Sequence, residues 1–358
     1  MMFERSILTL GMALLAGCAS APDKAFVAPV FPMPPEQPRF IYERTLISSA
    51  DVEVLSSEEK FKMFATGVAK DARGLSKPFG VAVHRGRIYV TDTIQNAVVM
   101  FDIPGQKFTT FGISGVGILG KPLGIDIADN GEVYVVDSLG KRVVVYDGDG
   151  KYLRSLGGKE NLERPSGVAV NREGTRLYVV DTGGVSSEKH CVQVFDALTG
   201  EFIRTIGKRG NEPGDFNLPL LASTDKDGNL YVMDSGNFRV ERFDANGEFQ
   251  HSFGKVGRNL GDFARPKGID VDREGNVYVV DTSFGNFQIF DREDQLLLFI
   301  GERTEKNEPA KYILPADIEV DEDGRIYVVE QFFRRVDVFR PYGMKAEEGF
   351  AAVAAQAR

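Results

Sequence analysis

Two sets of charged side chains recur at equivalent places in this sequence, and each set could bind a ligand. Cations stand directly before a proline, and carboxylates lie a few residues beyond it. A ring of Lys and Arg can concentrate an anionic ligand, whereas several carboxylates around one axis could supply the oxygen ligands that calcium prefers. The cations are Lys77, Lys121, Arg164 and Arg265, and the carboxylates are Asp126, Asp270, Asp317 and Glu319.

The cations also have a plainer interpretation. A surface Lys or Arg can extend its apolar stem over the protein and keep its charge in water without binding anything. A separate set of acids, which ends a repeated Tyr-Val-x-acid pattern, stands at strand ends, where carboxylates can accept backbone N–H bonds from the adjoining turn. Two hypotheses therefore remain open: a binding surface for a partner, or a hydrolase or lyase with a metal-dependent site built on the acidic residues.

The adjacent pair His190 and Cys191 invites a metal interpretation, but one pair cannot complete a site. A tetrahedral zinc centre takes three or four protein ligands, and the other histidines, His84 and His251, belong to different repeats. We therefore assign no metal ligand, no catalytic residue and no cofactor. The pair lies within the stretch from Asp181 to Asp196, which is five residues longer than its counterparts. We expect the extra residues, 182–189, to form a surface loop that contacts a partner.

The elements that would position these residues come from a sixfold internal repeat. The pattern Tyr-Val-x-acid occurs six times at intervals of 44 to 53 residues. Such periodicity indicates a repeat architecture. The tyrosines are Tyr89, Tyr134, Tyr178, Tyr231, Tyr278 and Tyr327, and the acids are Asp92, Asp137, Asp181, Asp234, Asp281 and Glu330.

Each repeat predicts four short antiparallel strands. In the unit from Pro266 to Gly301, strands are expected at 268–271, 277–280, 287–290 and 296–300, separated by turns rich in Asp, Asn and Gly. Four strands in about 45 residues are typical of a propeller blade. A β-sandwich would not repeat one motif six times. The sequence thus predicts an all-β, six-bladed β-propeller of four-stranded antiparallel blades.

The units resemble NHL repeats over about residues 75–343. That family combines Pro-x-Gly-Ile/Val, Asp-Gly-Asn, Tyr-Val-x-Asp and a strand ending in Phe-Asp. Matching segments are 122–125, 227–229, 231–234 and 194–196. The resemblance implies the propeller fold and little about function, because one fold hosts many functions. The related six-bladed lactonases and the amidating lyase imply a calcium and a zinc site, whose asparagine and histidine ligands have no clear counterparts here.

The sixth repeat contains only three clear strands, and residues 39–47 form a strand without a blade. We expect this N-terminal strand to supply the missing outer strand and close the ring, which reduces free sheet edges. A short helix is expected near residues 57–64. The propeller then spans residues 39–343, and residues 344–358 are expected to be a loose tail or marginal helix.

The first 18 residues combine Arg5, an apolar run too short to span a bilayer, and Leu15-Ala16-Gly17-Cys18. This arrangement fits a signal peptide and resembles the lipobox of bacterial lipoproteins. The resemblance implies that residues 1–17 are removed, that Cys18 carries acyl chains such as palmitate, and that the protein is anchored in the cell envelope, at the outer membrane. An ordinary signal peptide with a chance cysteine is the alternative.

Residues 18–38 contain six prolines, which favour an extended, semi-rigid tether. The net charge of −9 argues against nucleic acid as a partner. The sequence leaves the oligomeric state open. Our working hypothesis is a lipid-anchored binding or scaffold module for a protein or glycan partner at the envelope, contacted through loops 208–217 and 255–265.

Overall fold

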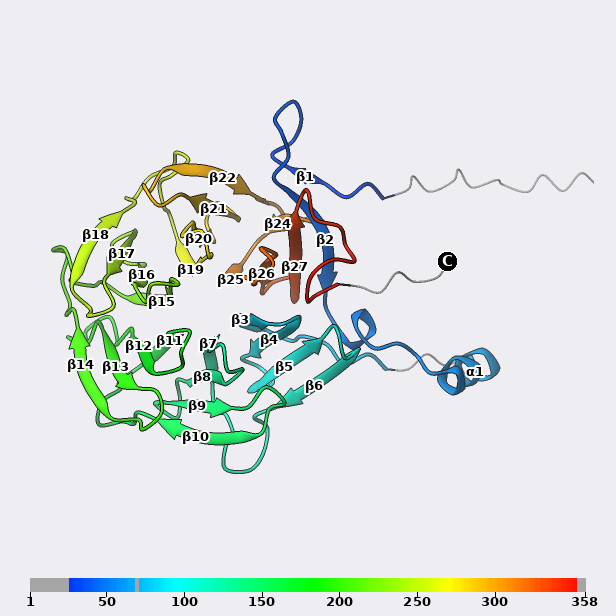
Figure 1. The fold of residues 1–358 in the computed structure, drawn as a ribbon, viewed down its shortest axis with the longest axis horizontal. Coiled ribbons are helices and arrows are strands. Elements are labelled where there is room, and N and C mark those ends of the chain that lie inside the picture. Colours follow the sequence, from blue (N-terminus) through cyan, green and yellow to red (C-terminus); the bar gives the residue numbers. More distant parts are fainter. Residues whose placement is uncertain (1–25, 68–70, 353–358) are drawn as a thin grey trace, which may run out of the picture.

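The computed structural model describes residues 26–67 and 71–352 of the chain. Six sheets surround a central axis, as predicted (Figure 1). The first strand of each blade is innermost, and neighbouring inner strands contact one another around the whole ring. These inner strands are β3 (Pro78–His84), β7 (Pro122–Ile127), β11 (Pro165–Val170), β15 (Pro219–Thr224), β19 (Pro266–Val271) and β25 (Pro315–Val320).

Blades one to five each add three antiparallel strands outward in chain order. Blade one contains β4 (Arg87–Asp92), β5 (Ala97–Asp102) and β6 (Lys107–Phe111), and blade two contains β8 (Val133–Asp137), β9 (Arg142–Tyr146) and β10 (Tyr152–Leu156). Blade three contains β12 (Arg176–Asp181), β13 (Cys191–Asp196) and β14 (Phe202–Ile206). Blade four contains β16 (Leu230–Asp234), β17 (Arg239–Phe243) and β18 (Phe249–Phe253), and blade five contains β20 (Val277–Asp281), β21 (Asn286–Phe290) and β22 (Leu296–Ile300).

Blade six confirms the predicted closure. Its sheet runs β25, β26 (Ile326–Glu330), β27 (Arg335–Pro341), β2 (Phe40–Leu46) and β1 (Val30–Phe31). Strand β2 pairs with β27 in antiparallel register from Phe40↔Pro341 to Leu46↔Val336. A buried ion pair adds to the seam, because Arg325 Nε lies 2.9 Å from Glu43 Oε2.

The core lies between blades, which explains why the second strands are almost wholly apolar. A strand covered on both faces needs apolar residues at every position rather than at alternate ones. All of β8 is buried, and Val133 and Val135 pack with Tyr89 and Met100 of blade one in a single hydrophobic cluster. Similar clusters join successive blades around the ring.

The carboxylate at the end of each second strand is structural, as the plainer interpretation expects. Asp281 accepts backbone N–H bonds from Ala264 (2.7 Å) and Arg265 (2.9 Å) before the inner strand, and from Ser283 (2.8 Å) and Phe284 (3.1 Å) in the turn. We call the side where inner strands begin the start face. It holds the turns after the second strands and the connections between blades. The opposite side is the end face.

The segments outside the ring are more ordered than expected. Helix α1 (Ser57–Thr66) confirms the predicted helix and is preceded by the short 3-10 helix η1 (Ser49–Asp51). Part of the expected tether is folded, since β1 pairs with β2. The C-terminal tail is not loose up to residue 352: Ala351 is fully buried, and its carbonyl accepts a bond from Arg44. No helix in the described ranges is long and apolar enough to cross a membrane. The signal segment and Cys18 lie outside those ranges.

Candidate binding faces around the central channel

The structure brings together the four predicted acidic residues in the central channel. Their carboxylates connect neighbouring inner strands: Asp126 of β7 accepts from Val170 N of β11 at 2.7 Å, and Asp270 of β19 accepts from Val320 N of β25 at 2.8 Å. Asp317 of β25 accepts from Val81 N of β3 at 3.1 Å. These carboxylates therefore contribute to the ring itself.

Burial changes the protonation of this carboxylate cluster. Burial raises the pKa of Asp126 to about 7 and that of Asp270 to about 6, although both accept backbone hydrogen bonds that oppose the shift. Burial and repulsion from Asp270 and Asp126 raise the pKa values of Asp317 and Glu319 well above their ordinary range. The free volume between the residues is about 20 Å³, roughly enough for one water.

No group of three or more His, Cys, Asp or Glu side chains in the described part of the chain is arranged to hold a metal ion. The carboxylates of Asp126, Asp270 and Asp317 accept backbone N–H bonds from the next blade, and Asp270 also accepts a bond from Ser223 Oγ at 2.7 Å. The arrangement can store protons and tie strands together. It does not present a ready set of calcium ligands.

The four predicted cations all lie on the start face, where Lys77, Lys121, Arg164 and Arg265 are exposed. Sequence reasoning missed a fifth, Lys267, the second residue of β19. Partial burial, together with the nearby charges of Arg265 and Lys77, lowers the pKa of Lys267 to about 8, and Glu330 opposes this shift. Lys77, Arg265 and Lys267 therefore gather on one side of the start-face mouth.

A closer alignment of the repeats could have found Lys267. It occupies the middle position of Pro-x-Gly, where the other repeats carry an apolar or small residue. Those residues are Phe79, Leu123, Ser166, Leu220 and Ala316.

Exposed apolar side chains stand at the tips of the start-face turns. In four blades the turn after the second strand carries one that is more than half exposed to solvent. These are Ile94, Leu139, Val185 and Phe332. The connection from blade one to blade two adds Ile113 and Val116. Sequence reasoning did not identify these tips, because turns show no apolar periodicity.

The blade-three insertion is fixed to blade four through His190. This buried imidazole accepts a bond from Leu218 N at Nδ1 (3.2 Å), so its Nε2–H donates to Gly184 O (3.0 Å). Burial also raises the pKa of the neighbouring Cys191 thiol to about 12. Both side chains thus serve the packing of the loop, while Val185 at its tip faces solvent.

The two loops expected to contact a partner share one construction on the start face. In each, a buried phenylalanine closes the loop by a backbone hydrogen bond: Phe216 N donates to Lys208 O (2.7 Å), and Phe263 N donates to Lys255 O (2.8 Å). The residues between are largely exposed. Both loops are therefore anchored at their bases and accessible at their tips.

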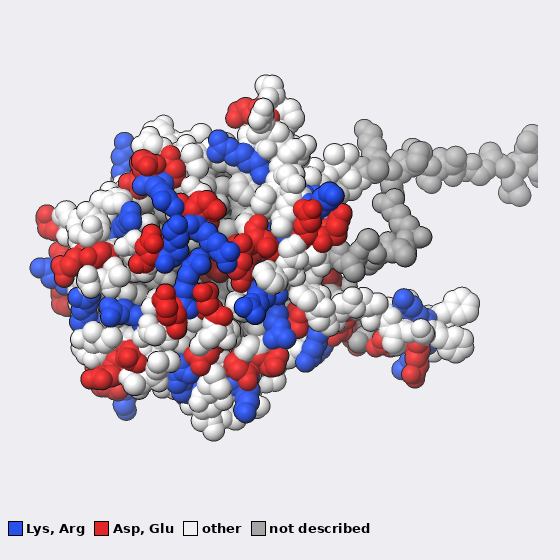
Figure 2. Space-filling view, in the orientation of Figure 1, with Lys and Arg blue, Asp and Glu red and all other residues white. Residues whose placement is uncertain are grey.

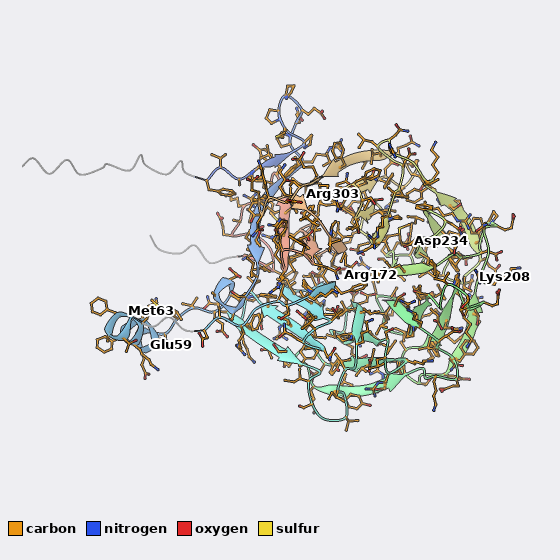
Figure 3. All side chains as sticks on the ribbon, turned by 180° about the vertical axis from the view of Figure 1, so that it is seen from behind. Glu59, Met63, Arg172, Lys208, Asp234 and Arg303 are labelled. Carbon is orange, nitrogen blue, oxygen red and sulfur yellow. The ribbon has the colours of Figure 1, made fainter. Side chains whose placement is uncertain are left out.

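The end face is more polar. Arg172, Lys226 and Arg273 occupy equivalent turn positions in blades three to five, and acidic Asp129 and Glu322 occupy them in blades two and six. Most of these residues line a hollow of about 90 Å³ above the channel. Figure 2 shows Lys and Arg gathered with Asp and Glu around the ring centre, and Figure 3 shows Arg172 near it.

Comparison with known proteins agrees with this architecture. Residues 162–195, which cover most of blade three, match the model of the NHL repeat. A protein of unknown function from Bacteroides thetaiotaomicron shares the fold at 21% identity and a TM-score of 0.60, over 75% of this chain and 70% of its own. No curated protein sequence matches significantly.

Two other similar structures have described roles of their own. An inactive variant of virginiamycin B lyase from Staphylococcus aureus, solved with quinupristin, is 14% identical (TM-score 0.54; 74% of this chain and 95% of that one). An auxiliary nutrient binding protein from Bacteroides ovatus is also 14% identical (TM-score 0.54; 72% and 66%). At these identities the likeness shows the fold alone. The chain is a six-bladed β-propeller that contains an NHL repeat in blade three.

Proposed function

We propose that this propeller is an envelope-anchored binding or scaffold module that holds a partner protein on its start face. The observation that carries the proposal is the set of exposed apolar tips there. Several exposed apolar side chains on one face can contribute to an interaction site, and interface centres favour apolar and Arg side chains over Glu and Asp. Leu139, Val185 and Phe332 would form the apolar contacts.

The start-face cations indicate the charge of the partner. Lys77, Arg265 and Lys267 lie together in a protein of net charge −9. Complementary charge speeds encounter and sets orientation more than it adds affinity. The partner surface that would match is therefore apolar where it contacts the turn tips and acidic where it lies opposite the mouth of the channel. An acidic glycan would engage the cations but not the apolar tips.

The proposed location follows from Cys18. We place the mature N-terminus at this residue, with acyl chains that hold the protein at the outer membrane, since stable anchoring takes more than one chain. Mass spectrometry of the N-terminal peptide from native membranes should show a lipid-modified Cys18. An unmodified peptide beginning at residue 18 or later would contradict the anchor and leave the binding face unaffected.

The binding face is tested by capture from native membranes after chemical crosslinking. We expect Leu139→Glu to reduce recovery of the partner at least tenfold. The matched control is Leu198→Glu, because Leu198 is a similarly exposed leucine in an end-face turn of blade three. Equal recovery with both variants would contradict the proposal. Stoichiometric calcium or zinc in the purified protein would instead favour the hydrolase or lyase alternative.

A further inference from the structure

The outer strand of blade five differs from its counterparts. Strand β22 reads LLLFI and has no polar side chain, whereas β6, β10, β14 and β18 each contain Thr, Ser, Arg, Gln or His. An outer strand faces solvent, and exposed edges are usually protected by polar or charged residues. Leu297 and Phe299 are each about two-fifths exposed. This unprotected edge requires a different explanation from the rest of the ring.

The strand forms one wall of a hollow in the described part of the chain. The hollow is a groove of about 660 Å³ between β22 and the N-terminal segment around β1, which lies beside it in Figure 1. Pro29, Phe31 and Met33 line the N-terminal side, and Leu297 and Phe299 line the other. Its volume lies in the range of about 300–1,000 Å³ that is usual for small-ligand sites.

We infer that this groove holds one acyl chain of the lipid on Cys18 of the same chain. The inference rests on the anchor in the proposed function. The chemistry fits, because the long walls are apolar and the charged lining residues are few, with Lys311 and Glu302 paired to each other. An acyl chain needs apolar contact along its length and no hydrogen-bonding partners.

The covalent chain places Cys18 within reach. Pro29, which already lines the groove, lies eleven positions after Cys18. At roughly 3.3–3.6 Å per residue, this segment spans at most about 40 Å. The lipid can therefore either insert into a bilayer or fold back along β1. Each methylene gains a similar amount on leaving water in either place, so the groove would shelter an acyl chain while the protein is away from a membrane.

The test uses the mature chain, residues 18–358, made without a signal peptide so that no lipid is attached. A fluorescent sixteen-carbon fatty acid should bind with a micromolar Kd, and Leu297→Glu should raise that Kd at least tenfold. The matched control is Ile203→Glu, at the corresponding position of β14 and also exposed, which should leave the Kd unchanged. Equal binding by both variants would overturn the site.

A second measurement identifies the occupant. Alkylation with N-hexadecylmaleimide should modify Cys18 selectively, because Cys191 is buried and burial raises its thiol pKa to about 12. We expect the alkylated chain to stay monomeric and to bind the fluorescent fatty acid at least tenfold more weakly. Unchanged fatty-acid binding after alkylation would show that the groove serves another acyl chain, and the inference would be wrong. Neither result depends on whether Cys18 is lipidated in cells.

Discussion

The two faces of the ring are built from the same repeat but present different surfaces. On the start face, a buried carboxylate such as Asp281 holds both the turn and the preceding connection, and the turn tips carry apolar residues such as Leu139. On the end face, an aspartate such as Asp272 accepts one backbone N–H bond, from Asn276 in its own tight turn, and side-chain bonds from Asn276 and the Tyr278 hydroxyl. The tips there carry Arg172, Arg273 and acidic residues.

The difference shows how one repeat separates structure from recognition. Because the start-face carboxylates fix the backbone from beneath, the tips above them are free to vary in sequence and length. The blade-three insertion uses this freedom, and His190 supplies the extra anchor that the longer loop needs. The end-face turns carry charged residues, and several of these line the hollow beside the carboxylates of the channel.

The largest expected effect comes from removing a start-face carboxylate. Asp281→Ala leaves four backbone N–H groups without their acceptor, and each buried unsatisfied group costs about 1–3 kcal/mol. We expect a loss of at least about 4 kcal/mol in the free energy of unfolding, measured with urea. Asp272→Ala, its end-face counterpart, should cost about 1–2 kcal/mol. Equal losses would contradict the distinction between the two faces.

The second effect concerns an end-face turn that includes a buried ion pair. Arg325 is fully buried and bonds Glu43 of the closing strand. Removing one partner of a buried pair costs about 3–5 kcal/mol, so Arg325→Met should destabilise blade six by about that amount. Hydrogen exchange should show faster exchange in β2 than in blade three. Uniform exchange across the ring would mean that the Arg325–Glu43 ion pair does not stabilise the pairing of β2 with β27.

A smaller effect concerns the channel between the faces. The raised pKa values of Asp126 and Asp270 mean that the folded protein binds more protons than the unfolded chain between about pH 4 and pH 7. These groups therefore add stability as the pH falls through that window. Asp126→Asn should reduce the difference in unfolding temperature between pH 5 and pH 8 by roughly 2–4 °C. An unchanged difference would argue against the shifted pKa.

Much of the fold followed from the sequence, because the repeat places a proline, a tyrosine and an acid in phase six times. The closing strand followed from counting three strands in the last repeat. Symmetry also predicted that Asp126, Asp270, Asp317 and Glu319 would share one axis. It could not show that their oxygens face backbone amides of the next blade, because that depends on the stagger between inner strands.

Other features depend on contacts that no local pattern encodes. The groove joins residues 29–36 to β22, more than 250 positions away. The carbonyl of the buried Ala351 accepts a bond from Arg44, which is 307 positions earlier in the chain. Lys267 follows its proline, so the pattern of cations that precede each proline does not include it. The apolar tips could not be predicted because they lie in turns, whose sequences follow no repeating apolar pattern and therefore vary from blade to blade.

Photo-crosslinking in native membranes tests most directly whether the partner binds to the start face. A photoreactive amino acid placed at Leu139 should yield a discrete crosslinked partner, whereas the same group at Leu198 on the end face should yield none. Both leucines are more than half exposed, so accessibility does not distinguish them. A partner captured at Leu198 and not at Leu139 would contradict the account.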